Sequence, residues 1–324
     1  MSGNTSKQLP SRRSLLAGAA GLGLATSSAA LAQKGPAVWL DMDQKALDDA
    51  YDQSVYAPNQ KDIQTRRNVN SQRVREAMPP QRVSYGPSEI EKLDIYRTTA
   101  GNAPVNIFIH GGAWRGGMAT EYAGPAEMMV KAGAHYVVLD FINVIEAGGD
   151  LMPMIEQIRR GIAWVAKNAG SFGGDASRMF VSGHSSGAHL GGVVTITDWQ
   201  KDHGLPADIV KGALLCSGMY DLKPVRLSAR SRYVKFTDAM EHALSIQRHL
   251  ARVNCPLIIA HGTSETPEFQ RQSREFVVAA KAAGKHAELI VGQGYNHFEM
   301  PETLNSPHGL LGRAVLRQMG LAGA

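Results

Sequence analysis

The sequence predicts an α/β fold in which a mainly parallel β-sheet carries helices on both faces. Beyond residue 80, short apolar runs alternate with longer stretches that have helical spacing, which is the pattern of such a sheet. The chain has 324 residues, of which 44% are hydrophobic and 19% charged, as expected for one large domain. The residues suited to chemistry follow strand candidates, and ligand sites in these sheets lie at the carboxyl ends of the strands.

Residues 1–32 have the features of an export signal. A twin-arginine pair, Arg12 and Arg13, precedes an Ala/Gly/Leu segment that ends in the small-residue cleavage site Ala30-Leu31-Ala32. We therefore expect the twin-arginine export machinery to carry the folded protein to the periplasm or the exterior, with cleavage after Ala32 and no stable membrane association afterwards. A retained membrane anchor is the alternative, but no lipid-acceptor cysteine follows the cleavage site.

Charge and cysteine content exclude several classes of function. Removal of residues 1–32 deletes three basic residues and no acidic ones, so the formal charge falls from +5 to +2. Such a small charge, without a basic aromatic stretch, gives no indication of nucleic-acid binding. Cys216 and Cys255 lie in apolar, strand-like runs, which favours buried free thiols over a disulfide. Neither belongs to a set with metal-ligand spacing, and we expect no metal.

The predicted elements form an N-terminal cap segment, residues 33–80, followed by the α/β domain, residues 81–324. The cap segment is polar and helix-prone and could cover a site. Strands are expected at 82–85, 92–96, 105–109, 136–139, 179–182, 210–216, 257–260 and 287–291. Helices are expected near 122–132, 151–166, 188–194, 238–251, 267–283 and 310–319.

The pentapeptide Gly183-His184-Ser185-Ser186-Gly187 lies between a strand candidate and a helix candidate. This is the setting of a nucleophile elbow, where a serine occupies a strained turn with its hydroxyl exposed. The two glycines allow close approach of the backbone at the turn, which a Cβ would oppose. Ser185 is the predicted nucleophile.

A serine hydroxyl needs a general base, and His297 is the best-placed of the eleven histidines. In α/β-hydrolases the histidine comes last, after the serine and the acid, and His297 lies on a loop after the final strand candidate. His184 flanks the nucleophile and could line the substrate pocket. His189 falls within the following helix, where packing is expected, and His308 lies near the last helix, where we expect a surface role.

Two carboxylates compete for the third position, which orients the imidazole and stabilises its charged form. Glu265 and Asp221 each follow a strand candidate. The usual chain position of the acid favours Glu265. Asp221 would then be a structural carboxylate that binds backbone amides of its own loop.

A glycine-rich loop after strand 105–109 supplies candidate donors for an oxyanion. It reads His110-Gly111-Gly112-Ala113-Trp114, and HGG-type loops occupy this position in esterases. The expected donors are backbone N–H groups of this loop and of the residue after the nucleophile: Gly111, Gly112, Ala113 and Ser186. The Trp114 side chain would either form a wall of the substrate pocket or belong to the core.

These motifs resemble the kynurenine formamidase (arylformamidase) branch of the α/β-hydrolases, near the hormone-sensitive-lipase-like esterases. The similarity covers most of residues 83–300 and includes the 110–114 loop, the segment 182–190 and the segment 217–222. Its most specific part is Glu265-Thr266-Pro267-Glu268-Phe269-Gln270-Arg271-Gln272-Ser273, where the family's catalytic acid, usually Asp, aligns with Glu265. His297 aligns with the family histidine. The chain departs from the family pattern in the 140–149 loop and in its export signal.

The combined reading is a serine hydrolase that cleaves a small ester or activated amide through an acyl-enzyme on Ser185, with no cofactor. The resemblance implies a second possibility, an arylformamidase that hydrolyses an N-formyl aromatic amine such as N-formylkynurenine. A third, of another class, is a non-catalytic binding protein on a hydrolase scaffold. The expected partner is a small-molecule ester or amide, and the sequence leaves the oligomeric state open.

Overall fold

The computed structural model describes residues 35–321, and the predicted export signal, residues 1–32, lies outside the described residues. The described residues from Pro36 onward form one compact unit. Its centre is an eight-stranded sheet in the order β1-β2-β4-β3-β5-β6-β7-β8. The strands are β1 Gln81–Ser84, β2 Lys92–Tyr96, β3 Ala103–Ile109, β4 His135–Leu139, β5 Gly174–His184, β6 Val210–Cys216, β7 Leu257–Gly262 and β8 Ala287–Gly292. Strand β2 pairs antiparallel with both β1 and β4, and every pair from β4 to β8 is parallel.

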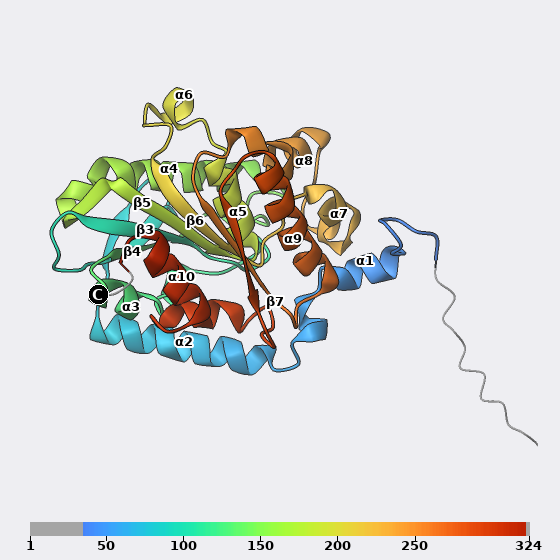
Figure 1. The fold of residues 1–324 in the computed structure, drawn as a ribbon, viewed down its shortest axis with the longest axis horizontal. Coiled ribbons are helices and arrows are strands. Elements are labelled where there is room, and N and C mark those ends of the chain that lie inside the picture. The colour runs from blue at the N-terminus through green and yellow to red at the C-terminus, as the bar shows by residue number, and fades with distance from the viewer. Residues whose placement is uncertain (1–34, 322–324) are drawn as a thin grey trace, which may run out of the picture. The chain divides into compact units, whose positions relative to one another are not determined.

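Helices cover both faces of the sheet, which confirms the predicted fold class (Figure 1). The helices are α1 Gln44–Ala50, α2 Gln60–Ala77, α3 Ala126–Lys131, α4 Met152–Asn168, α5 Ser186–Thr195, α6 Trp199–His203, α7 Leu222–Leu227, α8 Asp238–Leu244, α9 Pro267–Ala282 and α10 Leu310–Gln318. Side chains of α4, α5 and α9 pack in one core cluster with alternate strand residues such as Ile107. Those of α2, α3 and α10 pack in the other with residues such as Phe108. The alternation follows from the two-residue period of a strand.

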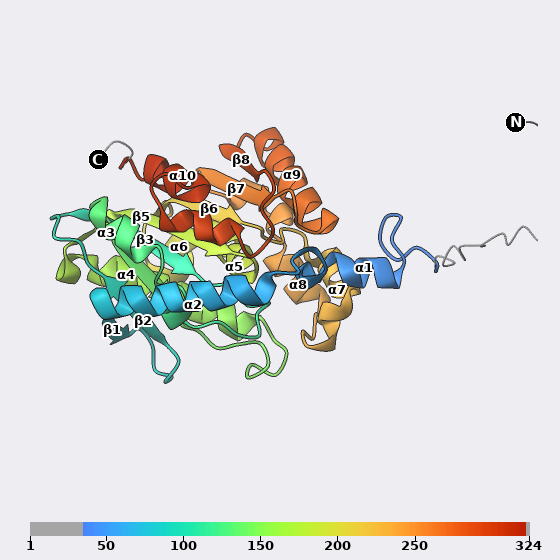
Figure 2. The same cartoon turned by 90° about the horizontal axis from the view of Figure 1, so that it is seen from below.

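The cap segment consists of two parts with different surroundings. Helix α1 and the 3₁₀ turn η1 (Gln53–Tyr56) lie near α7 and α9, and Gln44 Nε2 donates to the Leu227 carbonyl at 2.9 Å. Figures 1 and 2 both show α1 beside α7. Helix α2 runs on past the 3₁₀ turns η2 (Ala119–Glu121) and η7 (Met300–Asn305), and its Ser71 hydroxyl donates to the Glu121 carbonyl at 2.7 Å. None of the described helices is long and apolar enough to cross a membrane.

Two predicted helices are wrong in extent. The helix expected over 122–132 begins only at Ala126 and is α3, because Pro125 restricts the backbone of Gly124 before it. The helix expected over 238–251 ends at Leu244 and continues as two 3₁₀ turns, 246–248 and 250–252.

A tertiary contact ends this second helix. The Ser245 hydroxyl donates to the Glu241 carbonyl at 2.6 Å, and the Gln247 N–H donates to the Tyr220 carbonyl at 3.0 Å. The chain after Ser245 is therefore bonded to the loop that follows β6 rather than to its own helix. Two short helices, α6 and α7, were not predicted, and each begins at an aspartate cap, Asp198 and Asp221.

Candidate active site

Ser185 occupies the sharp turn between β5 and α5. Its φ is 58° and its ψ is −125°, a conformation that is costly for a residue with a Cβ. The flanking glycines permit this turn, because a Cβ on Gly183 would lie 2.4 Å from the Gly187 carbonyl oxygen, and one on Gly187 would lie 2.1 Å from that of Ile109. The backbone of the elbow therefore packs directly against the end of β3. Its hydroxyl is held at the carboxyl edge of the sheet, as the sequence predicts.

His297 and Glu265 complete a hydrogen-bonded chain with the serine. The His297 Nε2 atom lies 2.9 Å from Ser185 Oγ, and His297 Nδ1 lies 2.8 Å from Glu265 Oε2. All three side chains are buried, with exposed fractions of 7% for the serine, 4% for the histidine and 0% for the glutamate. A carboxylate on Nδ1 favours the tautomer with its proton there, which leaves Nε2 free to accept the serine proton.

The loops that carry the acid and the histidine are fastened to each other. Glu265 follows β7 and His297 follows β8, and the Ser264 N–H donates to the Tyr295 carbonyl at 3.0 Å. Gly262 allows this approach, since a Cβ there would lie 2.1 Å from the same oxygen. The separation of Glu265 from His297 is therefore fixed by backbone contacts.

The Glu265 carboxylate is held by groups that sequence reasoning missed. Its Oε1 accepts hydrogen bonds from the Ser217 hydroxyl and from the Gly262 N–H, both at 2.7 Å. Gln53 Nε2 lies 3.4 Å from Oε2. These contacts fix the orientation of the carboxylate that faces His297. Ser217 directly follows β6, so its position beside the end of β7 could have suggested a role, but no local signal marks Gln53.

Asp221, the competing acid, has a structural role. Its side chain accepts from the Lys223 N–H at 3.1 Å and caps α7. It also forms an ion pair with Arg248 at 3.1 Å. Among the described hydrogen bonds none joins it to a histidine, so the geometry favours Glu265 as the partner of His297.

His184 contacts both the backbone and the ring of His297. Its Nε2 donates to the His297 carbonyl at 2.9 Å, and the two rings lie 4.6 Å apart. Burial, together with repulsion from His297, holds the pKa of His184 well below 6.5. A neutral ring at this position adds no positive charge beside His297.

The 110–114 loop lies directly against the serine. A Cβ on Gly111 would lie 3.2 Å from Ser185 Cβ, and the next three residues have positive φ angles of 122°, 54° and 61°. Within residues 35–321, no hydrogen bond takes up the predicted donors, the N–H groups of Gly111, Gly112, Ala113 and Ser186. The loop is anchored by the Trp114 N–H, which donates to Ser186 Oγ at 3.2 Å. Free amides beside a serine at the start of α5 could stabilise an oxyanion.

The Trp114 side chain belongs to the core. It is 2% exposed, packs edge-on against His189 at 5.3 Å between ring centres, and lies under the Arg230 guanidinium at 5.5 Å. Of the two roles that the sequence left open for Trp114, the structure therefore favours the core over a wall of the substrate pocket. Cys216 and Cys255 are buried free thiols.

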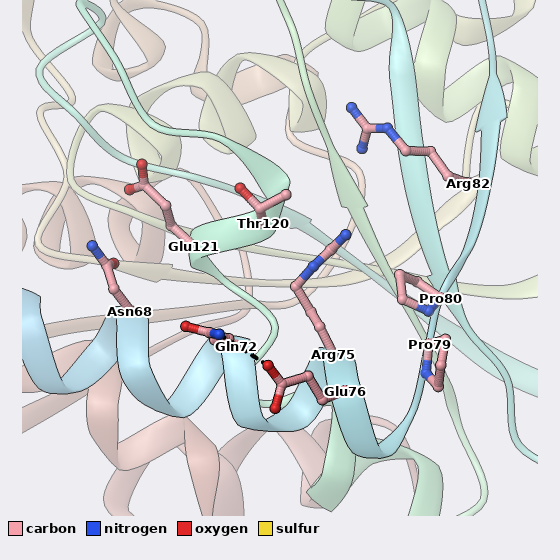
Figure 3. Close-up of a pocket in the computed structure, with 9 residues that line it drawn as sticks. All are labelled: Asn68, Gln72, Arg75, Glu76, Pro79, Pro80, Arg82, Thr120 and Glu121. Carbon is pink, nitrogen blue, oxygen red and sulfur yellow. Dashed lines mark hydrogen bonds between the residues drawn. The ribbon is translucent and has the colours of Figure 1, made fainter.

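A cavity of about 570 Å³ lies elsewhere on the molecule, between α2, the start of β1 and η2 (Figure 3). None of its lining residues comes from the elements that carry the serine, the histidine or the glutamate. Two lining arginines, Arg75 and Arg82, are committed to the buried carboxylate of Asp94. In the described part of the chain, no group of three or more His, Cys, Asp or Glu side chains could hold a metal ion.

The chain is similar to several known proteins. A family model described as BD-FAE matches residues 93–212. The chain is 31% identical to the kynurenine formamidase of Danio rerio over 245 residues, which cover 74% of this chain and 81% of that protein. It is 28% identical to Esterase LipC of Mycobacterium tuberculosis, over 71% of this chain and 63% of that protein. An esterase structure from Thermogutta terrifontis has a TM-score of 0.62 at 20% identity, covering 76% of this chain and 96% of that one.

Proposed function

The chain belongs to the kynurenine formamidase group of α/β-hydrolases, a hydrolase family, and we propose from this premise that it is a serine hydrolase of small esters or activated amides. The observation that carries the proposal is the hydrogen-bonded chain from Ser185 Oγ through His297 to Glu265, with contacts of 2.9 and 2.8 Å. A protein that only binds its ligand would not need a hydrogen-bonded Ser185–His297–Glu265 triad next to backbone N–H groups that have no hydrogen-bond partner.

In the proposed reaction His297 Nε2 takes the Ser185 proton as the serine oxygen attacks the carbonyl carbon of the substrate. Glu265 stabilises the imidazolium that forms. The carbonyl oxygen becomes an oxyanion, which the N–H groups of Ser186 and the 111–113 loop bind. His297 then gives its proton to the leaving group, and an acyl-enzyme remains on Ser185. Water, with its proton taken by His297, hydrolyses this ester.

A fluorophosphonate probe tests the proposal directly. We expect covalent labelling of Ser185 in the folded protein and none in Ser185→Ala, which should also lose turnover of 4-nitrophenyl acetate. Ser182→Ala is a matched control, because Ser182 is a buried neighbour whose hydroxyl accepts from Asn106 and does not contact His297. A wild-type protein that takes up no probe while folded would exclude the mechanism.

The identity to the Danio rerio kynurenine formamidase favours a second candidate within the same mechanism, an arylformamidase that acts on N-formylkynurenine. A formyl group is the smallest acyl group, so this candidate requires rates that fall from formate to acetate to butyrate esters. Turnover of N-formylkynurenine and of the three aryl esters should be compared on one preparation. A preference for N-formylkynurenine by orders of magnitude would favour the formamidase over a general esterase.

We also propose export of the protein by the twin-arginine route, on the basis of residues 1–32. Expression of the full chain with a C-terminal tag, followed by fractionation, should give a periplasmic product that begins at Gln33. Replacement of Arg12 and Arg13 by lysine should retain the protein in the cytoplasm. Unchanged export of that variant would argue against the twin-arginine route.

A further inference from the structure

The turn that carries His297 is closed by its own side chains. Asn296 directly precedes the histidine and is 5% exposed. Its Oδ1 accepts from the N–H groups of Phe298 and Glu299 at 3.0 and 3.1 Å. In return, the Asn296 N–H donates to Glu299 Oε2 at 3.0 Å. These reciprocal bonds have the pattern of a capping box, and they fix the backbone on both sides of His297.

Asn59 joins this turn to the start of α2. Its Oδ1 accepts from Asn296 Nδ2 at 2.9 Å, and its Nδ2 donates to Glu299 Oε1 at 3.1 Å. Since Glu299 also binds the Asn296 N–H, the three residues form a closed ring of hydrogen bonds. The ring connects segments that are 237 positions apart along the chain.

The Asn59 side chain is not used by its own helix. Asn59 is the residue before α2, a position where asparagine usually accepts from an N–H group of the first helical turn. Within the described part of the chain, its side chain makes no such capping bond. Both of its polar groups contact the turn of His297 instead. The side chain therefore stabilises that turn rather than the start of α2.

The turn must hold His297 in two contacts at once. Its Nε2 lies 2.9 Å from Ser185 Oγ, and its Nδ1 lies 2.8 Å from Glu265 Oε2. Two side chains from different elements hold the backbone that sets these distances: His184, at the end of β5, donates to the His297 carbonyl, and Asn59 binds the turn from α2. A misplacement of about 1 Å can lower the rate of a reaction about 10²-fold.

We propose that Asn59 is a positioning residue for the general base, which fixes the turn at 296–299 so that His297 stays aligned with Ser185 and Glu265. The inference rests on the proposed serine hydrolase function. It gives the start of α2, which supplies no side chain to the Ser185–His297–Glu265 chain, a part in the rate of the reaction.

Asn59→Ala removes both hydrogen bonds between α2 and the turn. We expect its kcat for 4-nitrophenyl acetate to fall at least about tenfold with KM changed less than about twofold, because the base is misaligned while substrate binding is kept. The kcat should be expressed per Ser185 that a fluorophosphonate labels at completion, so that unfolded protein does not contribute. The rate of this labelling, which also requires the base, replaces kcat if turnover of the ester is undetectable.

Arg66→Ala is the matched control. Arg66 also lies in α2 and makes two hydrogen bonds to the chain after His297, from Nε and Nη2 to the Glu302 carboxylate at 2.7 and 2.5 Å. None of the described hydrogen bonds joins Arg66 to residues 296–299. Arg66→Ala should therefore keep the wild-type kcat, whereas a general loosening of α2 would lower kcat in both variants.

An exchange of donor and acceptor tests the ring itself. Asn59→Asp places a carboxylate against that of Glu299, and Glu299→Gln places an amide against that of Asn59, so each single variant should lose kcat. In the double variant the new amide at position 299 can donate to the new carboxylate at position 59, and its oxygen can accept from the Asn296 N–H. Its kcat should return to within about threefold of wild type, since the two changes compensate each other. This double variant also provides the test if Asn59→Ala does not fold.

The outcomes separate the two proposals. If wild type is neither labelled on Ser185 nor active on the ester, the serine hydrolase function fails, and the role of Asn59 fails with it. If wild type is active and folded Asn59→Ala keeps its kcat, only the role of Asn59 fails. That role also fails if Asn59→Ala and Arg66→Ala lose kcat equally, or if the double variant is no faster than the slower single variant. Asn59 would then only fasten α2 to the rest of the fold.

Discussion

The Ser217 hydroxyl donates a 2.7 Å hydrogen bond to Glu265, the carboxylate whose other oxygen faces His297. Ser217 has a φ of 56°, a strained backbone conformation for a residue with a Cβ. This conformation occurs at the end of β6, where the hydroxyl reaches Glu265. The bond joins two neighbouring strand ends and fixes the rotation of a buried carboxylate. It extends the Ser185–His297–Glu265 chain by one positioning residue.

Removal of the Ser217 hydroxyl should lower activity through kcat. Ser217→Ala and Ser217→Gly both leave Glu265 Oε1 with the Gly262 N–H alone, and a hydrogen bond to a charged group contributes about 1.5–3 kcal/mol. We expect kcat to fall about tenfold in both variants, with KM little changed. Urea denaturation should show Ser217→Gly to be the more stable of the two, because glycine tolerates positive φ. Wild-type kcat in both would show that the hydroxyl does not position the acid.

Gln53 is the residue of the N-terminal cap segment, residues 33–80, that contacts the Glu265 carboxylate. Its Oε1 accepts from the Thr266 N–H at 3.1 Å, and its Nε2 lies 3.4 Å from Glu265. Gln53→Glu keeps the acceptor and places a second carboxylate beside the first. We expect destabilisation of about 2–4 kcal/mol in urea, larger at pH 8 than at about pH 5.5, because the fold would raise the pKa of the added carboxyl.

The neutral variant Gln53→Met separates charge from shape. It loses the acceptor for Thr266 but adds no charge, so its stability should be lower than wild type by a similar amount at both pH values. If Gln53→Glu shows the same loss as Gln53→Met at every pH, the repulsion from Glu265 is absent. Activity measured in parallel should be lowest in Gln53→Glu.

The sequence permitted prediction of features that depend on local patterns. The elbow at 183–187 is marked by two glycines that the turn requires, and the strands by apolar runs of strand length. The order of the chain then indicates which histidine follows the last strand. Each of these signals is contained in a short stretch of sequence, so it can be recognised without knowing which distant segments come into contact.

The features that could not be predicted depend on contacts between distant segments. Gln53 and Glu265 are separated by 212 positions, and Arg230 lies 179 positions from its acceptor in Tyr51. The end of the 238–251 helix is decided by the bond from Gln247 to Tyr220, which only the folded chain brings together. Propensity alone favours a longer helix there, and the tertiary contact overrides it.

Gly187 should be the least replaceable glycine of the elbow. A Cβ there would lie 2.1 Å from the Ile109 carbonyl oxygen and 2.5 Å from that of His110, and both are backbone atoms of the β3 end. Gly187→Ala should therefore lose on the order of 4 kcal/mol of stability and its activity. Gly116→Ala is the control, since a Cβ at Gly116 meets nothing within 4 Å. Equal melting temperatures for the two variants would contradict the packing described here.

Stability should fall on acidification, in part because of His189. The side chain is fully buried in α5, with Nε2 bonded to the Leu244 carbonyl at 3.0 Å and no partner for Nδ1. Burial lowers its pKa from 6.5 to about 4. The unfolded chain therefore binds a proton near pH 6.5 that the folded protein rejects until near pH 4.

The stability that His189 contributes is complete above about pH 6.5 and is lost as the pH falls toward 4, by about 3 kcal/mol in total. The buried neutral His184 acts in the same direction. Free energies of unfolding in urea at about pH 8, 6 and 5 should show the decline. His189→Gln, which keeps a donor for Leu244, should reduce the slope between pH 6 and 5 by about 1 kcal/mol per pH unit. The exposed His242 is the control, and His242→Gln should leave the slope unchanged. A wild-type slope in His189→Gln would mean that this ring titrates normally in the folded protein.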